Sequence, residues 1–596
     1  MKHKKVLSAV AAAALALTMG ATGCTVPVSS GAAPGATGAE ATANAGDGAT
    51  TQPAAVNDSA DNPAKGRAGA ADTLIVGGQD TSNLFMPIYY SSRFDRWITD
   101  LAFSRLYSND EEGNITYNDD SLATGCDFSD DHKTLTFHLK DGVKFSNGDP
   151  LTAEDVKFTY QLVACPAYQT GEDGGRYIDA MTNVVGFEDY RDGKTEELAG
   201  IKVIDPLTIS FEFKEARVDN ILNFYDVQIM SKNYYGVGVT KDNIKPIMDK
   251  MKNFDFMGSG RYIIKHIEPK QYVEMEVNPN YFGGAAKIKN LIYKTVTPET
   301  MFEELKSGGV DILLRVPANA DDEARLNEMP FVTTTKYIEN SYAYIGLNTA
   351  DQRLSDVKVR QALTYGFNRQ GFMDLYFSGN GVVFGIPFSP ASWAYTDAVK
   401  PYPFDPAKAN QLLDEAGWTE KDADGIRMKD GQKLDFTWDT YTDSKYVETM
   451  IPLLTADWKN IGVKVTPNLM DFSALADKVY EQQDFQMYNM SWALDIDPAS
   501  IYTNFGSQAT VKSGNNSVQY KNPELDKLML DGMREFDQAK RKEIYTKVAE
   551  ILNRDCPYVF IGTPQNWDSC NTRVKNFNPS PYRDWTYDIR LMELEP

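Results

Sequence analysis

The chain has 596 residues, with 60 lysines and arginines against 83 aspartates and glutamates, and a formal charge of −23. Hydrophobic residues make up 42% and aromatic residues 12% of it, which excludes a chain that is disordered throughout. This length fits several domains, because a single core rarely grows beyond about 250 to 300 residues. The acidic balance argues against a nucleic-acid partner, whose phosphates require a basic surface.

The N-terminus has the pattern of a secretory signal peptide, which we place at residues 1–23. Three lysines precede an apolar run over 6–17, which is shorter than the roughly 20 residues that a membrane-spanning helix needs. Small residues directly before Cys24 resemble a bacterial lipobox, although Ala21 stands where a leucine is usual. We expect Cys24 to be the lipidated N-terminus of the mature protein. The alternative is an ordinary secretory cleavage beside an unrelated cysteine.

Residues 24–72 are predicted to be a flexible tether behind the lipid. Between residues 25 and 72 there is no aromatic residue, leucine, isoleucine or methionine, so little apolar surface is available to offset the entropy of ordering. A lipid and a tether together predict a protein displayed on the extracytoplasmic face of a bacterial cell membrane. Further along the chain, no apolar stretch approaches the 18 residues that would indicate a membrane span.

Four cysteines follow the tether: Cys126, Cys165, Cys556 and Cys570. Outside the cytoplasm an even number of cysteines suggests disulfides, and four allow three pairings. Proximity along the chain favours Cys126 with Cys165 and Cys556 with Cys570. In the second pair, a strand-like run over 557–562 would turn back toward Cys570. Four free, buried thiols are the alternative.

Strands and helices are predicted to alternate along the rest of the chain, without a repeat, which indicates an α/β fold. Thr152 and Asp155 give the capping signature of a helix that continues to residue 160, and residues 404–406 cap another helix that ends at Gly417. Two further helices are predicted near 298–308 and over 355–368. Strands are predicted at 74–76, 135–139 with a returning hairpin strand at 143–145, 258–264 paired with 273–277, 291–295, 311–314 and 342–347.

Eight segments in order resemble family 5 of the extracellular solute-binding proteins, the oligopeptide- and dipeptide-binding components of ABC importers. Each segment alone is a weak signal, but together they cover nearly all of residues 74–596. They are LTFHLKDGVKFSNGDPLTAEDVKFTY (135–160), GSGRY (258–262), NPNYF (278–282), VKVRQALTYGFNR (357–369), FDPAKANQLLDEAGW (404–418), WKNIGVKV (458–465), WALDIDP (492–498) and YKNPELDKL (520–528).

The resemblance implies a type II periplasmic-binding-protein fold, in which two lobes joined by a hinge close on a ligand, with one extra domain. It implies domain I over 73–104, 232–339 and 565–596, domain II over 105–231, and domain III over 340–564. The hinge crossings would lie near Asn340 and Asn566. The implied function is capture of short peptides for delivery to membrane permease subunits, by a protein that we expect to be a monomer.

The resemblance also implies the ligand site. Peptide-binding members carry a tryptophan followed three residues later by an aspartate that receives the ligand's α-ammonium, here Trp492 and Asp495. A buried ammonium needs such a carboxylate, and Asp497 does not have the spacing. Asn489 stands where some oligopeptide binders carry an arginine, and Tyr177 lies near the position at which domain II of the family contributes a tyrosine. The alternatives are that Asp495 only caps a helix or solvates its loop and that Trp492 only packs in the core.

Enzyme motifs of the HExxH, GxSxG and Walker types are absent from the sequence, so we expect no enzyme, cofactor or metal. The cluster Asp127, Asp130 and Asp131 lacks EF-hand spacing and is interpreted as a solvated loop. Within the same fold, the ligand could instead be an oligosaccharide, a nickel complex or haem. Two further hypotheses are a surface sensor or adhesion protein that works without a transporter, and a secreted hydrolase.

Overall fold

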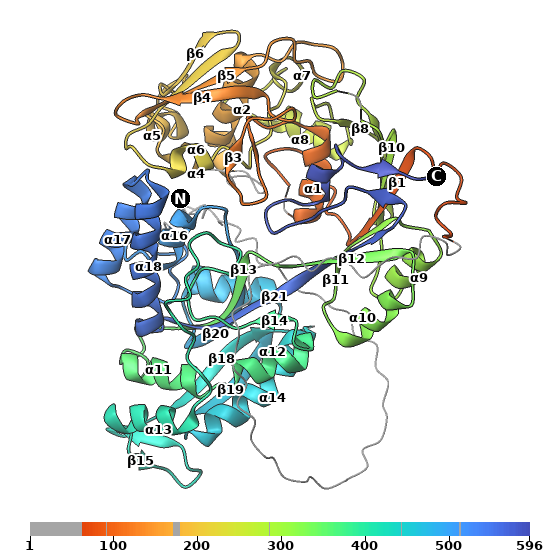
Figure 1. Cartoon of the computed structure of the whole chain (residues 1–596). Helices are drawn as coiled ribbons and strands as arrows, with labels where there is room; N and C mark the ends of the chain where they lie inside the picture. Colours follow the sequence, from red (N-terminus) through yellow and green to blue (C-terminus); the bar gives the residue numbers. More distant parts are fainter. Residues whose placement is uncertain (1–61, 91, 171–178, 285, 443, 512–513) are drawn as a thin grey trace, which may run out of the picture.

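A computed structural model describes residues 62–596 except residue 91 and residues 171–178, 285, 443 and 512–513 (Figure 1). The predicted signal peptide, Cys24 and residues 25–61 of the predicted tether therefore lie outside the described residues, as does Tyr177. The described chain is a mixed α/β structure, as the sequence predicts.

The largest sheet of the described residues has twelve strands. Its strands are β1 (Thr73–Gly78), β8 (Tyr262–Glu268), β9 (Tyr272–Val277), β10 (Asn290–Thr295), β11 (Ile312–Val316), β12 (Val332–Ile338), β13 (Ser341–Leu347), β14 (Gly381–Val382), β18 (Asp435–Tyr441), β19 (Lys464–Met470), β20 (Met487–Ala493) and β21 (Tyr558–Asn571). The strand order is β19-β18-β20-β13-β21-β11-β1-β10-β9-β8, and β12 and β14 also pair with β21. β1 is parallel to β10 and β11, and β18 is parallel to β19 and β20, while the other pairs are antiparallel.

The other strands of the described residues form four smaller sheets. A four-stranded antiparallel sheet has the order β4-β5-β7-β6 and lies at the top of Figure 1; its strands are β4 (Ala123–Phe128), β5 (Thr134–Leu139), β6 (Ile201–Asp205) and β7 (Thr208–Glu212). The other three are short: β2 (Ser108–Asn109) with β3 (Ile115–Thr116), β15 (Glu420–Lys421) with β16 (Arg427–Lys429) and β17 (Gln432–Lys433), and β22 (Val574–Lys575) with β23 (Glu593–Leu594).

Two groups of helices accompany the strands. The first group comprises α1 (Arg93–Ala102), α2 (Ala153–Ala164), α3 (Pro166–Thr170), α4 (Asp179–Thr182), α5 (Phe187–Arg191), α6 (Asp219–Leu222), α7 (Lys232–Tyr235), α8 (Lys245–Lys252), α9 (Met301–Lys306), α10 (Ala320–Asn327) and α19 (Trp585–Asp588). The second comprises α11 (Val357–Tyr365), α12 (Arg369–Phe377), α13 (Pro406–Glu415), α14 (Lys445–Asn460), α15 (Phe472–Ala476), α16 (Tyr502–Phe505), α17 (Pro523–Arg534) and α18 (Gln538–Asp555). Of the helices in the described part of the chain, none combines the length and hydropathy needed to cross a bilayer.

The predicted helix caps are confirmed. Thr152 and Asp155 form a capping box at the start of α2, and the Asp405 carboxylate accepts a hydrogen bond from the Lys408 amide at the start of α13. The hairpin predicted after residue 139 is wrong. β5 pairs with β4 on one side and β7 on the other, so both of its edges are occupied, and residues 143–145 form only an isolated bridge between Lys144 and Pro150.

The buried apolar residues divide the described chain into two lobes. One large core is built from residues between Leu74 and Leu314 and between Cys570 and Met592, and a second from residues between Tyr342 and Ile561. A third, smaller core of residues between Val296 and Met329 with Trp567 belongs to the same part of the chain as the first. We call residues 62–338 and 565–596 the first lobe and residues 341–563 the second lobe. The sheet β4-β5-β7-β6 shares the core of the first lobe. The finer division into domains I, II and III stays a prediction.

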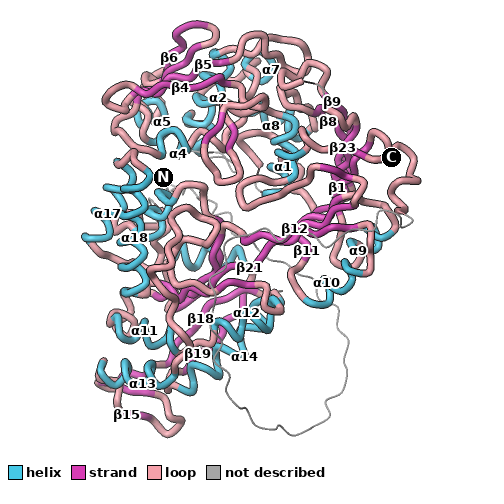
Figure 2. Tube along the Cα trace, in the orientation of Figure 1, coloured by secondary structure: helices cyan, strands magenta, loops and turns pink. Residues whose placement is uncertain are grey.

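β21 is hydrogen-bonded to both lobes. Its first half pairs with β13 and its second half with β11 and β12, and Figure 2 shows the strands continuing from one lobe into the other. At Gly562 the strand has φ of +131°, and a Cβ atom there would lie 2.1 Å from the carbonyl oxygen of Val382. Only glycine therefore fits this position. The other connection between the lobes is the two-residue link between β12 and β13.

Glu339 lies in that link and is 7% exposed. Its carboxylate forms ion pairs with Arg315 at 2.9 Å and with Arg93 at 3.1 Å. Burial opposes ionisation of Glu339, but the two guanidiniums outweigh it and lower the pKa of this carboxyl to about 2. The link between the lobes is therefore held in place by a charged triad.

The predicted end of the tether at residue 72 is wrong, because residues 62–72 pack against the first lobe. The guanidinium of Arg67 donates hydrogen bonds to the carbonyl of Gly308 and the carboxylate of Asp311, both at 2.7 Å. Asp311 also pairs at 2.7 Å with Arg573, and both of these side chains are 0% exposed. Asn62 and Asn571 hydrogen-bond each other through their side chains. Polar contacts thus order a segment whose lack of large apolar residues had suggested a free coil.

The four cysteines of the described chain are free in the structure, which contradicts both predicted disulfides. Cys556 precedes β21 and Cys570 lies near its far end. A strand of 14 residues spans about 45 Å, whereas a disulfide needs Cα atoms within about 7 Å. The run that begins at residue 558 continues into the other lobe instead of turning back. Cys126 lies in β4 and Cys165 follows the end of α2.

We expect Asp311→Asn to lower the stability of the protein by about 3 to 5 kcal/mol, because it leaves the buried guanidinium of Arg573 without a counter-charge. Denaturant unfolding followed by circular dichroism would measure the loss. Asp531→Asn is the matched control, since its ion pair with Lys527 is exposed on α17. Equal unfolding midpoints for the two variants would contradict this role of Asp311.

Because the pKa of Glu339 is lowered in the folded protein, its ionised form stabilises the fold at pH values above about 4.5, and this contribution is lost as the pH falls toward about 2. We therefore expect Glu339→Gln to unfold at a lower temperature than wild type at pH 7, with the gap closing between pH 4.5 and 2. Thermal unfolding at several pH values tests this. The exposed Glu448→Gln on α14 should follow wild type throughout, and a gap that does not depend on pH would count against the ion pairs.

Candidate functional site

A cavity of about 1460 Å³ lies between the two lobes. The first lobe contributes the residues around α1, the segment before β2 and the chain around α19. The second lobe contributes the end of β20 and the loop and short helices that follow it, and Glu339 and Asn340 of the link form part of the wall. Any change in the angle between the lobes would therefore change the shape of this cavity.

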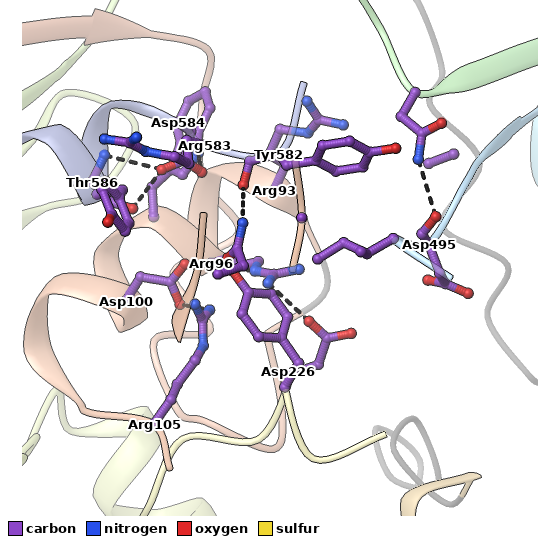
Figure 3. A pocket seen from close by; sticks show the side chains of 18 of the residues that line it. Arg93, Arg96, Asp100, Arg105, Asp226, Asp495, Tyr582, Arg583, Asp584 and Thr586 are labelled. Carbon is purple, nitrogen blue, oxygen red and sulfur yellow. Dashed lines mark hydrogen bonds and ion pairs between the residues drawn. The ribbon is translucent and has the colours of Figure 1, made fainter. Parts of the chain in front are cut away.

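Asp495 lies in the loop after β20, has an exposed side chain and lines the cavity. The side-chain amide of Asn340 donates hydrogen bonds to the carbonyl oxygens of Leu494 at 3.1 Å and Asp495 at 3.0 Å. The amide of Leu494 in turn donates to the carbonyl of Asn340 at 2.8 Å. In Figure 3, Asp495 lies across the cavity from Arg96, Asp226 and Tyr582 of the first lobe. The link between the lobes thus fixes the backbone that carries the Asp495 carboxylate.

Asp497 also lines the cavity, but its carboxylate is held within the second lobe. It accepts hydrogen bonds from the guanidinium of Arg541 at 2.6 and 2.7 Å and from the amide of Ala499 at 2.9 Å, and the residue is 9% exposed. This bidentate, buried pair has a structural role. The carboxylate that the sequence spacing selected, Asp495, is the more exposed of the two.

Trp492 and Asn489 lie on β20 but in different surroundings. Trp492 is 8% exposed, packs in the core of the second lobe and also lines the cavity; its contact with a ligand side chain stays a prediction. Asn489 is 1% exposed and does not line the cavity in the described structure. Side chains three positions apart on a strand point to opposite faces, so β20 cannot present both residues to the same space. The structure does not bring Asn489 to Asp495.

Tyr177 lies outside the described residues. Ala180 and Thr182, which follow it closely in the chain, line the cavity from the first lobe.

The arginines of the cavity wall are not among the residues predicted from the sequence. Seven arginines of the described chain line the cavity, and each forms an ion pair with an aspartate or glutamate. Arg96 pairs with Asp226 at 2.8 Å, and Arg105 pairs with Asp100. These partners are mostly distant in sequence and belong to no short motif, so no local signal indicates them.

Among the described residues of the wall there are ten carboxylates and seven guanidiniums, and no lysine or histidine. Asp584 is held by neutral donors: the indole of Trp97 donates to it at 2.7 Å and the amide of Thr586 at 3.0 Å. Asp568 accepts from the hydroxyl of Tyr337 at 3.0 Å, and burial raises the pKa of its carboxyl. The wall is therefore suited to a ligand with a positive charge.

Aromatic side chains supply the apolar part of the wall, among them Phe94, Tyr225, Tyr502, Tyr582 and Trp585. The guanidinium of Arg105 stacks on Tyr225 with 4.7 Å to the ring centroid. Such flat surfaces can pack against ligand side chains of many shapes. Within the described residues, no group of three or more histidines, cysteines, aspartates and glutamates is arranged to hold a metal ion.

A family model described as bacterial extracellular solute-binding proteins, family 5 Middle, matches residues 120–513. The oligopeptide-binding protein AppA of Bacillus subtilis is 30% identical over 526 residues, which cover 86% of this chain and 90% of that protein. The haem-binding protein A of Haemophilus influenzae is 25% identical over 477 residues, which cover 78% of this chain and 82% of that protein.

The solved structure of Bacillus subtilis AppA in complex with a nonapeptide superimposes with a TM-score of 0.71 at 28% identity. The match covers 88% of this chain and 99% of that chain. The matching family model, the relatives that align over most of their length and the two-lobed structure agree with one another. This chain belongs to family 5 of the bacterial extracellular solute-binding proteins.

Proposed function

We propose that this protein captures short peptides outside the cell by enclosing them between its two lobes and delivers them to a membrane permease for import. The observation that carries this proposal is the position of Asp495: its carboxylate lies on the wall of the cavity between the lobes, and its backbone is anchored to the link that joins them. A peptide's α-ammonium enclosed there needs a carboxylate at hydrogen-bonding distance, because a buried charge without a partner is costly.

The size and charge of the cavity favour a peptide. A volume of about 1460 Å³ exceeds the roughly 300 to 1,000 Å³ of pockets for drug-sized ligands. The excess of carboxylates suits a cationic terminus, and the aromatic residues suit varied side chains. AppA, the relative with the highest identity quoted above, is an oligopeptide-binding protein. Haem remains the second candidate, because the haem-binding relative aligns over 78% of this chain.

Opening and closing would occur at the two connections between the lobes. The hinge in this proposal consists of residues 339–341 and 563–565, next to Gly562, where β21 passes from one lobe to the other. The predicted crossing at Asn340 lies within the first connection, and that at Asn566 lies one residue beyond the second. Domain II, over 105–231, would then move with domain I because the two share one core.

The location follows from family membership and from the N-terminal sequence. The family is extracellular. In this proposal the mature chain begins at Cys24, a lipid on that residue anchors it to the cell membrane, and the tether lets the lobes reach the permease. The protein would act as a monomer that binds and releases its ligand unchanged, without catalysis.

We expect Asp495→Asn to weaken the binding of peptides with a free N-terminus by about tenfold or more, since it removes one partner of an enclosed charge pair. Isothermal titration calorimetry measures the change. Asp397→Asn is the matched control, because its carboxylate is exposed on the second lobe and outside the cavity. N-acetylated peptides should bind weakly to wild type and to Asp495→Asn alike.

Equal affinities of wild type and Asp495→Asn for the same free peptide would refute the ammonium contact. Mass spectrometry of small molecules released when the purified protein is denatured identifies the cargo directly. Peptides among them would support the proposal, and haem or an oligosaccharide would replace it.

We expect Cys24→Ser to move the protein from the membrane fraction to the culture medium or periplasm, because the residue that would receive the lipid is gone. Fractionation followed by immunoblotting detects the change, with Cys126→Ser as the control cysteine. A variant that stays in the membrane fraction would contradict lipid anchoring at Cys24.

A further inference from the structure

The turn between α17 and α18 of the second lobe touches the first lobe at a place far from the hinge strands. In Figure 1 these two helices lie at the left edge of the molecule, below α4 and α6, whereas β21 passes between the lobes near the centre. Met533, at the end of α17, lines the cavity together with Arg217 and Asp219 of the first lobe. The contact therefore closes the cavity at a point away from the hinge.

Three different interactions join the lobes there. The amide of Val218 donates a hydrogen bond to the carbonyl of Met533 at 2.8 Å. The guanidinium of Arg534 pairs with the carboxylate of Glu215 at 3.2 Å. A hydrogen bond, an ion pair and, as described next, an aromatic stack thus come from three residues, Met533, Arg534 and Phe536, within a stretch of four.

Phe536 provides the aromatic contact. Its ring stacks on His132 with centroids 4.0 Å apart and an interplanar angle of 23°, and it meets Phe128 edge-on at 6.2 Å. Phe128 packs against the core of the first lobe. Phe536 is 38% exposed even in this arrangement. Separating the lobes would expose its ring further, so this contact favours the arrangement in which the two lobes touch here.

We infer that residues 533–536 form a latch that holds the two lobes together and slows the release of the enclosed ligand. The effect on ligand release rests on the proposed function, whereas the effect on the lobes themselves does not. Each contact is individually modest, and two of the three involve exposed side chains. The latch can therefore open without unfolding either lobe. A contact far from the hinge is also the one that a small hinge rotation separates first.

Hydrogen exchange at the amide of Val218 tests the latch without any ligand, because this N–H bonds across the two lobes. We expect Phe536→Ala and Arg534→Glu to speed exchange in the segment around Val218 by about three- to tenfold, the range expected from losing one such contact. Exchange in β5, which lies inside the first lobe, should stay unchanged.

Two controls separate the latch from general destabilisation. Phe404→Ala removes a phenylalanine that is 41% exposed on the second lobe, close to the 38% of Phe536, and should leave exchange at Val218 as in wild type. Glu215→Arg combined with Arg534→Glu reverses the ion pair and should restore the protection that Arg534→Glu removes. Unaltered exchange at Val218 in both Phe536→Ala and Arg534→Glu would overturn the latch.

The consequence for the ligand is measured with a peptide that has a free N-terminus and a fluorescent label at its C-terminus. Stopped-flow displacement should show release about three- to tenfold faster from Phe536→Ala than from wild type, with a similar association rate. If hydrogen exchange at Val218 is faster but the peptide dissociates at the wild-type rate, the latch does not slow ligand release. If this peptide does not bind the wild-type protein, the proposal that the protein captures peptides fails. The hydrogen-exchange result still decides whether residues 533–536 hold the two lobes together.

Discussion

The two lobes share the strand β21, and the geometry of the cavity between them depends on this shared strand. Half of β21 is hydrogen-bonded to the first lobe and half to the second. Backbone hydrogen bonds fix each half of the strand within its own lobe, so a change in the angle between the lobes would occur mainly at residues 563–565 of β21 and at the short link between β12 and β13. A ligand between the lobes is thus met by two rigid walls whose separation a few residues control.

The link also connects the hinge to the ligand site. Glu339 is held by two arginines, and the next residue, Asn340, holds the backbone of Asp495. The carboxylate proposed to receive a ligand ammonium therefore sits at the base of the hinge, where closure moves it least. At the other side of the cavity, the turn over 533–536 contacts the first lobe through exposed side chains. A fixed contact near the hinge and a separable contact far from it suit a protein that must both hold and release its cargo.

The charged side chains of the cavity wall differ in whether an arginine neutralises them. The seven arginines of the wall are ion-paired, and Asp497 is fixed by Arg541. Asp584 and Asp568 are instead held by neutral donors. Since pairing with arginine consumes most of the charge of the wall, the remaining negative potential is concentrated on few carboxylates. Binding through aromatic surfaces and one charged contact would place few requirements on the side chains of the ligand. The protein would then accept peptides of many sequences.

The sequence alone determined the family, the alternation of strands and helices, and the capped starts of α2 and α13; Asp495 as a ligand residue is what the family resemblance implies. These are local: a cap or an alternating strand is written in residues that are neighbours in the chain. The tertiary structure decided the free cysteines, the order of residues 62–72, the burial of Asn489 and the ion pairs of the cavity wall. Each of these depends on which distant segments meet. Arg67 pairs with Asp311, which is 244 residues away, and β21 places Cys570 far from Cys556. No local pattern in the sequence encodes such contacts.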